Sequence, residues 1–413
     1  MALNRGGHDP FKVYAAYARA AAHQGQPTVI LAKTVKGYGM GESGEGQNIT
    51  HSQKKMADES LLEFRDRFRI PLDDEAVLAC EFYHPGDDSP EVRYLKERRD
   101  ALGGSLPIRI DAAPTHATPD LSLFQSQLEG SGDREISTTM AFVRLLTALT
   151  RDKSLGTHVV PIVPDESRTF GMEGMFRQLG IYAPKGQLYI PEDADQLMYY
   201  REDIKGQVLQ EGITEAGAMS SWIAAATAYS NHGIAMIPFY IFYSMFGLQR
   251  IGDLAWAAGD QQARGFLIGG TAGRTTLAGE GLQHQDGHSL LMAAGIPNCV
   301  SYDPTFNYEL AVIVHDGIRR MYTDQENVFY YVTVMNENYA HPPMPEGAQE
   351  GILQGMYRLR QAAKGRKAVP RVQLFGSGTI LRESIAAAEL LEQDFGVLAD
   401  LWSVTSYNEL ARQ

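Results

Sequence analysis

The sequence predicts an α/β fold, a doubly wound parallel sheet that occupies the middle of the chain. Apolar runs alternate there with helix-length segments from Ile136 onward. We expect strands at 158–163, 234–243, 265–270 and 327–334, and helices at 138–151, 211–229, 247–263 and 306–321. This alternation is typical of parallel sheets that helices cover on both faces. In addition, the span 216–249 contains no Asp, Glu, Lys or Arg, as expected for a buried helix followed by a buried strand.

The first part of the chain has the pattern of an incomplete domain. A helix is expected at 10–24 after the candidate cap Asp9, followed by a buried strand at 26–34. The Gly-rich, polar segment 37–57 predicts a long mobile loop. Because one helix and one strand cannot cover both faces of a parallel sheet, residues 1–82 are expected to be the end of a domain.

Changes in composition mark the other boundaries. Residues 83–135 are rich in Pro, Gly, Asp and Ser and predict a linker that contains one charged helix at 91–101. The main domain is then expected at 136–340. A second linker, 341–370, precedes the start of a further α/β domain at 371–413, with a strand at 371–375, a helix at 380–395 and a strand at 399–404.

Composition excludes several classes of protein. The 413 residues carry a formal net charge of -13, so no basic surface is expected to attract nucleic acid. Cys80 and Cys299 lie far apart without metal-ligand spacing, which favours a reducing compartment. The N-terminus has no signal-peptide pattern, and polar residues with Pro238 interrupt the uncharged span, so no membrane helix is expected. We therefore expect a cytoplasmic protein.

Two glutamates follow predicted strands or open predicted helices. Glu215 begins a helix that is otherwise apolar and small, and the simplest interpretation is a first-turn glutamate favoured by the helix dipole. The functional interpretation is a buried carboxyl with a raised pKa that hydrogen-bonds a ligand nitrogen and carries a proton. Glu166 directly follows a predicted strand, at the sheet edge where ligands bind in such folds.

Aromatic and histidine residues add further candidates. Tyr243 and Phe246 lie at the end of the strand 234–243, where an aromatic run is more often core than ligand platform. His284 and His288 have the spacing of a helical zinc pair, but the intervening Gln-Asp-Gly predicts a loop and disfavours a metalloprotease. His51 lies in the segment 37–57, either as a solvated histidine or as a lid residue that transfers protons.

Several longer segments carry a specific resemblance. They are Leu31-Ala-Lys-Thr-Val-Lys-Gly-Tyr-Gly-Met-Gly, Arg168-Thr-Phe-Gly-Met-Glu-Gly, Tyr243-Ser-Met-Phe-Gly-Leu-Gln-Arg-Ile-Gly-Asp, Ala258-Gly-Asp-Gln-Gln-Ala-Arg-Gly-Phe and Gly279-Glu-Gly-Leu-Gln-His. Together they closely resemble the homodimeric, bacterial-type pyruvate dehydrogenase (acetyl-transferring) family, from Leu3 to Arg412. The resemblance implies the thiamine-diphosphate-binding fold, with a pyrimidine-binding domain at 136–340 and the end of a diphosphate-binding domain at 1–82.

The resemblance also implies roles for the candidates. Glu215 would contact the pyrimidine N1′ nitrogen, and Phe246 would stack on the pyrimidine ring. Tyr243 and His284 would face the substrate, and Glu166 would belong to the acidic surroundings of Glu215. His51 would assist acetyl transfer from the lid, which Glu45 and Lys54 would help to order.

An enzyme of this family uses thiamine diphosphate and Mg²⁺ to decarboxylate pyruvate. Its partners would be a second copy of the chain and the lipoyl domain of a dihydrolipoamide acetyltransferase. No Gly-Asp-Gly motif followed by Asn occurs here, so no metal ligand is assigned and the metal and diphosphate ligands are expected upstream of this chain. The chain is accordingly expected to be an internal fragment that is inactive by itself.

Two alternatives remain open from the sequence. One is another thiamine-diphosphate enzyme, such as a transketolase or a different 2-oxo acid dehydrogenase. The second is a non-catalytic fragment that only dimerises, which the missing diphosphate motif favours and the set Glu215, Tyr243, His284 and His51 disfavours.

Overall fold

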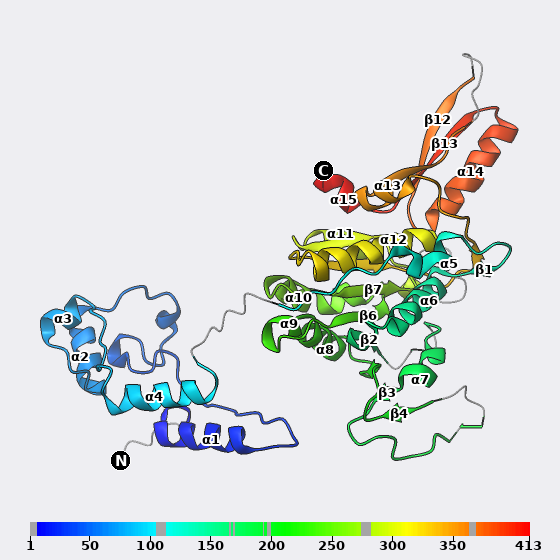
Figure 1. Ribbon diagram of the computed structural model, residues 1–413. Coiled ribbons are helices and arrows are strands. Elements are labelled where there is room, and N and C mark those ends of the chain that lie inside the picture. The colour runs from blue at the N-terminus through cyan, green and yellow to red at the C-terminus, as the bar shows by residue number, and fades with distance from the viewer. Residues whose placement is uncertain are drawn as a thin grey trace. The chain divides into compact units, whose positions relative to one another are not determined.

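The computed structural model divides the chain into two units. Unit 1 comprises residues 1–108 and unit 2 residues 109–413 (Figure 1). The structure describes residues 6–104, 113–164, 167, 170–192, 194–195, 200–273, 282–362 and 369–413. Within these ranges no helix is both long and apolar enough to span a membrane.

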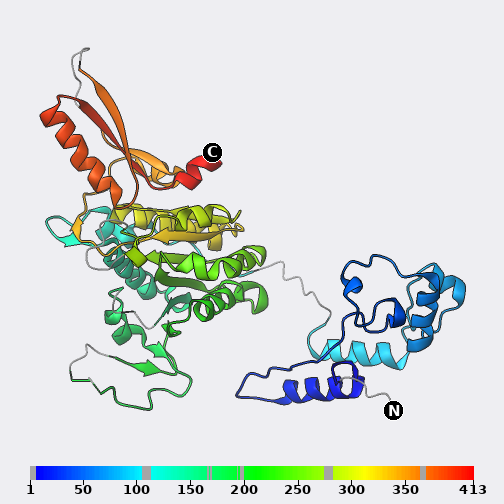
Figure 2. The same cartoon turned by 180° about the vertical axis from the view of Figure 1, so that it is seen from behind.

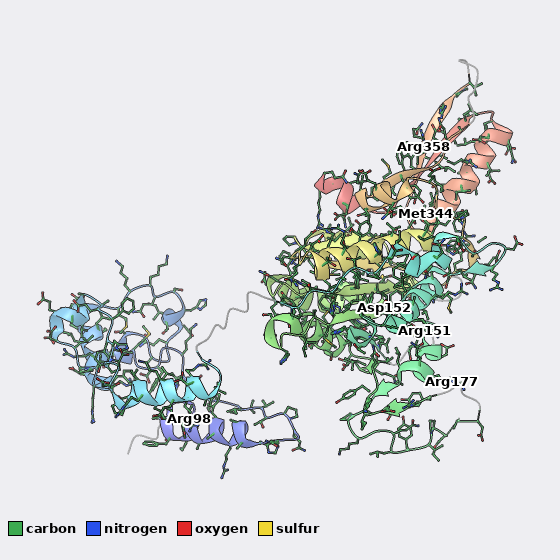
Figure 3. The ribbon with its side chains drawn as sticks, in the orientation of Figure 1. Arg98, Arg151, Asp152, Arg177, Met344 and Arg358 are labelled. Atoms are coloured by element: carbon green, nitrogen blue, oxygen red, sulfur yellow. The ribbon has the colours of Figure 1, made fainter. Side chains whose placement is uncertain are left out.

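Unit 1 is helical in its described part. Its helices are α1 (Pro10–Ala22), α2 (Asp58–Phe68), α3 (Asp74–Leu78) and α4 (Pro90–Ala101). Asp9 caps α1 through its carboxylate, as expected, and α4 confirms the predicted charged helix. Tyr14 of α1 and Tyr94 of α4 share a hydrogen bond of 3.0 Å, and the Arg98 guanidinium lies 5.3 Å from the Tyr94 ring centroid (Figure 3).

The predicted strand at 26–34 is wrong. This segment is extended but pairs with no strand, and Val29 and Leu31 are 82% and 93% exposed. Its backbone is held only near its end, where Gly7 donates to the Lys33 carbonyl at 3.2 Å. An apolar segment becomes a buried strand only when neighbouring strands supply hydrogen bonds and cover its faces, and the described part of unit 1 contains no strand.

Unit 2 is built on a six-stranded sheet in which all strands run parallel. The order is β5-β2-β6-β7-β9-β8. The strands are β2 (Val159–Val163), β5 (Leu209–Gln210), β6 (Ile237–Tyr243), β7 (Phe266–Gly270), β8 (Cys299–Tyr302) and β9 (Phe329–Thr333). The predicted parallel α/β fold is therefore confirmed. The sequence missed β8 and β5, which have only four and two residues.

Helices cover both faces of this sheet (Figures 1 and 2). One face carries α8 (Glu215–Ala226), α10 (Gly247–Asp260) and α11 (Ser289–Ala294), which share a buried cluster with Tyr240 and Leu267 of the strands. The opposite face carries α6 (Thr138–Arg151) and α12 (Asn307–Ile318), which pack on Phe239 and Ile268. Successive residues of a strand point to opposite faces, so β2, β6, β7, β8 and β9 each contribute to both clusters.

Two smaller parts project from opposite ends of unit 2 (Figures 1 and 2). Beyond β5, the paired strands β3 (Ile181–Tyr182) and β4 (Glu202–Asp203) form an arm that α7 (Glu173–Leu179) precedes. At the other end lies a three-stranded sheet, β11-β13-β12. Its elements are β11 (Met356–Arg360), β12 (Arg371–Gly376), α14 (Ile380–Asp394) and β13 (Leu398–Val404); along the chain α13 (Ala348–Gln354) precedes β11 and α15 (Tyr407–Arg412) follows β13.

Further short elements complete unit 2. They are α5 (Gln125–Leu128), α9 (Ala228–Asn231) and the antiparallel pair β1 (Glu135–Ile136) and β10 (Tyr339–Ala340). The C-terminal helix and strands that the sequence predicted, α14, β12 and β13, are confirmed, whereas the antiparallel β11 was missed.

Candidate active site

The predicted carboxylate stands where a helix begins. Glu215 is the first residue of α8, and the Thr214 hydroxyl caps that helix by accepting the Gly217 N–H at 3.2 Å. The N–H groups of the first turn and the helix dipole favour a negative charge at this position. The Glu215 side chain is 21% exposed and forms an ion pair with Arg250 of α10. Glu215 is therefore half-buried and ion-paired. The functional interpretation from the sequence had expected a buried carboxyl.

A cavity of about 320 Å³ opens beside Glu215 at the carboxyl ends of β2 and β6. Its lining combines the ends of several elements that are distant in sequence. The lining residues are Pro164, Ile213, Thr214, Glu215, Tyr240, Phe242, Tyr243, Phe246, Arg250 and His284. This is the edge of a parallel sheet at which α/β proteins bind ligands, and the volume suits a ring-sized molecule.

The aromatic part of the cavity is a cluster of three rings. The Tyr243 and His284 ring centroids lie 5.0 Å apart, and Phe246 lies 5.5 Å from His284 and 6.1 Å from Tyr243, all edge-to-face. Gly247 follows Phe246 and starts α10, and a Cβ there would lie 1.9 Å from the Phe242 ring. A glycine is therefore required for α10 to begin this close to β6 and to present Phe246 to the cavity.

The structure brings together four of the six candidates. Glu215, Tyr243, Phe246 and His284 line the cavity. Glu166 lies outside the described residues, and its role stays a prediction. His51 belongs to unit 1, where it ends the 3₁₀ turn Asn48–His51 and its Nδ1 lies 2.9 Å from the Lys36 amino group.

The predicted lid segment has little regular structure and contacts α2 through Ser43, which hydrogen-bonds Ser60, and through Glu45, which pairs with Arg67. The Glu45 carboxylate accepts from Arg67 of α2 at 2.5 Å and from the Gly39 N–H at 3.2 Å. The Arg67 guanidinium lowers the pKa of Glu45. Lys54 and His51 are exposed on the same segment. The mobility of the segment 37–57 stays a prediction.

Sequence reasoning missed Arg250 as a member of the site. Its guanidinium lies 4.6 Å from the Phe246 ring centroid while it pairs with Glu215. The spacing contained the signal, because residues four apart lie on one face of a helix and Arg250 follows Phe246 by four at the start of α10. Tyr240 was also missed. Burial raises the pKa of its phenol, and the nearby Glu215 and Glu211 carboxylates raise it further.

His288 does not face the cavity with His284. Its Nε2 lies 2.5 Å from the Gln249 amide, and its ring nitrogen lies 3.8 Å from the Asp286 carboxylate. Burial acts to raise the pKa of Asp286, but hydrogen bonds from Ser289 and from the His288 backbone outweigh it and the pKa is lowered. Within the described ranges no group of three or more His, Cys, Asp or Glu side chains could hold a metal ion.

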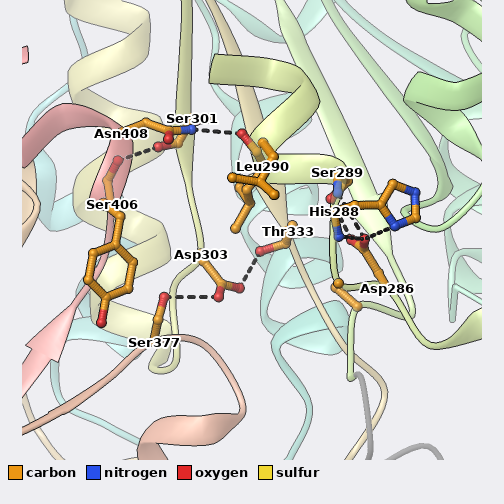
Figure 4. A pocket seen from close by; sticks show the side chains of 14 residues that line it. Asp286, His288, Ser289, Leu290, Ser301, Asp303, Thr333, Ser377, Ser406 and Asn408 are labelled. Atoms are coloured by element: carbon orange, nitrogen blue, oxygen red, sulfur yellow. Dashed lines mark hydrogen bonds and ion pairs between the residues drawn. The ribbon is translucent and has the colours of Figure 1, made fainter. Parts of the chain in front are cut away.

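A second cavity, of about 280 Å³, lies between the sheet and the C-terminal segment (Figure 4). The polar side chains that line it form hydrogen bonds with one another. Asp303 accepts from the hydroxyls of Thr333 at 2.6 Å and Ser377 at 2.9 Å, and Asn408 donates to the Ser301 hydroxyl at 2.6 Å (Figure 4). These contacts tie the C-terminal segment to the sheet.

Comparison with solved structures defines the class of protein. The fold is similar to that of transketolase from Campylobacter jejuni, with a TM-score of 0.65 and 17% identity over 98% of this chain and 56% of that one. Transketolase from Leishmania mexicana gives a TM-score of 0.62 and 16% identity over 98% and 55%. At these identities the likeness shows the fold alone, which is that of the transketolase-like α/β proteins.

Sequence comparison then gives the family. The chain belongs to the pyruvate dehydrogenase E1 component family, because the model of that component's middle domain matches residues 117–342. The model of the transketolase-like C-terminal domain matches residues 355–413.

Curated relatives agree over nearly the whole chain. It is 64% identical over 410 residues to the pyruvate dehydrogenase E1 component of Pseudomonas aeruginosa and 61% identical over 412 residues to that of Cupriavidus necator. Identity to the Escherichia coli component is 56% over 413 residues. These alignments cover 99–100% of this chain but 46% of each relative, so the chain spans about half the length of the relatives it matches.

Proposed function

We propose that this chain supplies the aminopyrimidine-binding half of a thiamine-diphosphate enzyme that decarboxylates pyruvate and passes the acetyl group to lipoamide. The observation that carries the proposal is the convergence of Glu215, Tyr243, Phe246 and His284 on one cavity. The names of the relatives support pyruvate as the substrate.

The cavity fits a flat, polar heterocycle. Phe246 offers an aromatic surface, Glu215 offers a carboxylate beside it, and the volume of about 320 Å³ is at the lower end of that found for small-molecule sites. When bound, the cofactor supplies the carbon that attacks the keto group and takes up the electrons left by carbon dioxide. Glu215 binds the N1′ nitrogen and holds a proton there, and Phe246 stacks on the ring.

The other residues complete the site. Tyr243 and His284 face the substrate, and Glu166 adds negative charge near Glu215. Mg²⁺ and the diphosphate would be held by residues upstream of this sequence, in the diphosphate-binding half of the site that the partner subunit of a homodimer supplies. The assembly works in the cytoplasm within a multienzyme complex, with the lipoyl domain of a dihydrolipoamide acetyltransferase as its partner.

The test is a single substitution at Glu215, made in protein that is supplied with its diphosphate-binding half. We expect Glu215→Gln to lower the rate of carbon dioxide release from pyruvate by at least about a hundredfold, because an amide cannot take up and return the proton. Glu350→Gln is the matched control, since Glu350 also lies in the first turn of a helix but on the exposed surface of α13. Near-normal activity of Glu215→Gln would overturn the proposal.

A separate substitution tests the role of His51. We expect His51→Ala to slow acetyl transfer to lipoamide more than decarboxylation measured with an artificial electron acceptor, because only the first reaction needs a proton donor at the lipoyl group. His23, an exposed histidine at the end of α1, provides the control His23→Ala. Equal losses in the two assays would remove His51 from acetyl transfer.

A further inference from the structure

Tyr240 carries a buried hydroxyl that faces the proposed pyrimidine site. The side chain is 1% exposed, lies on β6 and lines the same cavity as Glu215. Within the part of the chain that the structure describes, this hydroxyl has no hydrogen-bond partner. A buried polar group without a partner costs free energy, and native structures contain few of them. The Tyr240 hydroxyl therefore needs an explanation.

Every other buried tyrosine in the described part of unit 2 uses its hydroxyl within the protein. Tyr302 of β8, for example, donates to the Leu353 carbonyl at 2.8 Å. The remaining hydroxyls bind carbonyls, carboxylates or other hydroxyls, and they belong to Tyr308, Tyr322, Tyr330, Tyr331, Tyr339 and Tyr357. Tyr240 is the one among them that lines the cavity beside Glu215. Its partner is therefore expected inside that cavity.

Three charged groups act on this hydroxyl. Burial raises the pKa of Tyr240, the Glu215 and Glu211 carboxylates raise it further, and the Arg250 guanidinium lowers it. The phenol therefore keeps its proton at neutral pH and acts as a hydrogen-bond donor. Glu211 accepts the Ser221 hydroxyl at 2.6 Å, and Glu215 accepts from Arg250. Each carboxylate still has lone pairs for a further donor, because two oxygens offer about four acceptor sites.

A water molecule matches this arrangement of one donor and two acceptors. Its oxygen accepts the proton of Tyr240, and its two hydrogens donate to Glu215 and Glu211. An ordered water needs about two to four polar partners and about 10–15 Å³ of space. The cavity offers about 320 Å³, so such a water can stay in place beside a bound ring.

We propose that Tyr240 is a positioning residue for Glu215, which it holds through one water molecule shared with Glu211. The water keeps the Glu215 carboxylate aimed at the ligand ring. Arg250 keeps its place in this arrangement, because its ion pair with Glu215 and the water use different lone pairs of the carboxylate. The inference rests on the proposed function, since it concerns the same carboxylate.

The kinetic test is Tyr240→Phe, made in protein that is supplied with its diphosphate-binding half. We expect kcat for carbon dioxide release to fall about tenfold with the KM for pyruvate unchanged, because a hydrogen bond that positions a charged group is lost and the substrate is not touched. Tyr302→Phe is the matched control, since it removes an equally buried hydroxyl outside the cavity and should leave kcat unchanged. The fold should tolerate Tyr240→Phe, because Phe239 and Phe242 already occupy the same strand.

A double-mutant cycle shows whether Tyr240 acts through Glu215. In Glu215→Gln protein, Tyr240→Phe should cause no further loss of the residual carbon dioxide release, because the carboxylate that Tyr240 positions is gone. An equal loss in both backgrounds would mean that Tyr240 acts independently of Glu215 and would overturn the inference.

A crystal structure of the unliganded 413-residue chain tests the water without relying on activity. It should show one water about 2.5–3.0 Å from the Tyr240 hydroxyl and within hydrogen-bond distance of Glu215 and Glu211. The same water should be missing from the structure of Tyr240→Phe, which also shows whether this variant keeps the fold. A Tyr240 hydroxyl bonded directly to a protein group would overturn the inference.

The outcomes separate the inference from the proposed function. Normal kcat of Tyr240→Phe, with Glu215→Gln still inactive, would overturn the positioning role and leave the proposed function standing. Near-normal activity of Glu215→Gln would overturn both. A loss in Tyr240→Phe that disappears in Glu215→Gln protein, together with the water in the unchanged chain, supports both.

Discussion

At the scale of single residues, the role of a titratable group depends on what the fold places against it. Glu215 and Glu309 are both first-turn glutamates of helices in unit 2. Glu215 faces a cavity and an exposed arginine, whereas Glu309 is fully buried. A first-turn position in the sequence therefore cannot distinguish a ligand-binding carboxylate from a structural one.

His341 shows how burial fixes the protonation state of a side chain. Its Nδ1 accepts the Asn307 N–H at 3.2 Å, and its Nε2–H donates to the Ile136 carbonyl at 2.9 Å. Burial lowers the pKa of His341 from 6.5 to about 4, with Arg382 and Arg144 contributing in the same direction. Only the neutral ring satisfies both partners, because the protonated ring has no acceptor nitrogen.

This pKa predicts a pH-dependent stability. As the pH falls below about 6.5 the unfolded chain takes up the proton first, so the contribution of neutral His341 is present above this pH and is lost between about 6.5 and about 4. The difference corresponds to about 3 kcal/mol at about 1.4 kcal/mol per tenfold change in proton affinity. We expect urea unfolding to show this loss in the unchanged chain and not in His341→Phe. If the free energy of unfolding depended on pH identically in the two proteins, His341 would not be the cause of the loss.

At the scale of elements, α12 joins the central sheet to the C-terminal strands through Glu309. One carboxylate oxygen accepts the N–H groups of Thr305 at 2.6 Å and Phe306 at 2.9 Å. The other accepts the hydroxyls of Tyr357 of β11 at 2.7 Å and Ser403 of β13 at 2.6 Å. Burial raises the pKa of Glu309, which these hydrogen bonds oppose. Four donors from three elements thus share one carboxyl.

The two oxygens of the Glu309 carboxyl have different kinds of donor, so we expect substitutions by Gln and by Ala to differ in effect. Backbone N–H groups can only donate, whereas hydroxyls can rotate and accept. We therefore expect Glu309→Gln to lower the free energy of unfolding by only about 1 kcal/mol, with its amide donating to the hydroxyls. Glu309→Ala leaves both N–H groups and the Ser403 hydroxyl without this acceptor, whereas Tyr357 can still donate to the Tyr308 hydroxyl, and the substitution should cost about 3–5 kcal/mol. Chemical denaturation measures both, with Glu350→Ala as the exposed control, and equal losses for Gln and Ala would refute this account.

The elements also show what sequence patterns can predict. Strands β2, β6, β7 and β9 and helices α6, α8, α10, α12 and α14 lie within the predicted segments, because long apolar or amphipathic runs give a clear period. Strand β8 and the arm strands β3 and β4 were missed because two to four residues carry no period. The strand predicted at 26–34 was wrong although its pattern is clear, because a strand also needs neighbouring strands, which a local pattern does not provide.

The site was predictable to a different extent. Glu215, Tyr243, Phe246 and His284 were named from strand ends, helix starts and resemblance, and the structure places all four on one cavity. Arg250 lies four residues after Phe246, which was a local signal, but its ion pair with Glu215 joins two helices across 35 positions. Pairings of that kind depend on the packing of α8 against α10, which no local pattern contains.

At the scale of the whole molecule, the residues that the proposed function uses are divided between the two units. Unit 1 holds His51 and the segment 37–57, and unit 2 holds the cavity. The chain spans 46% of the length of its curated relatives. The proposed function therefore assigns carbon dioxide release to this chain together with a diphosphate-binding half. Activity is then a property of the assembly, whereas recognition of the pyrimidine ring is a property of unit 2.

The most direct test of this account is a crystal structure of the chain with thiamine diphosphate, supplied with its diphosphate-binding half. We expect the aminopyrimidine ring in the cavity of unit 2, stacked on Phe246, with a ring nitrogen about 2.7–3.2 Å from the Glu215 carboxylate. A ring bound outside this cavity, or bound in it with its nitrogens turned away from Glu215, would contradict the central claim.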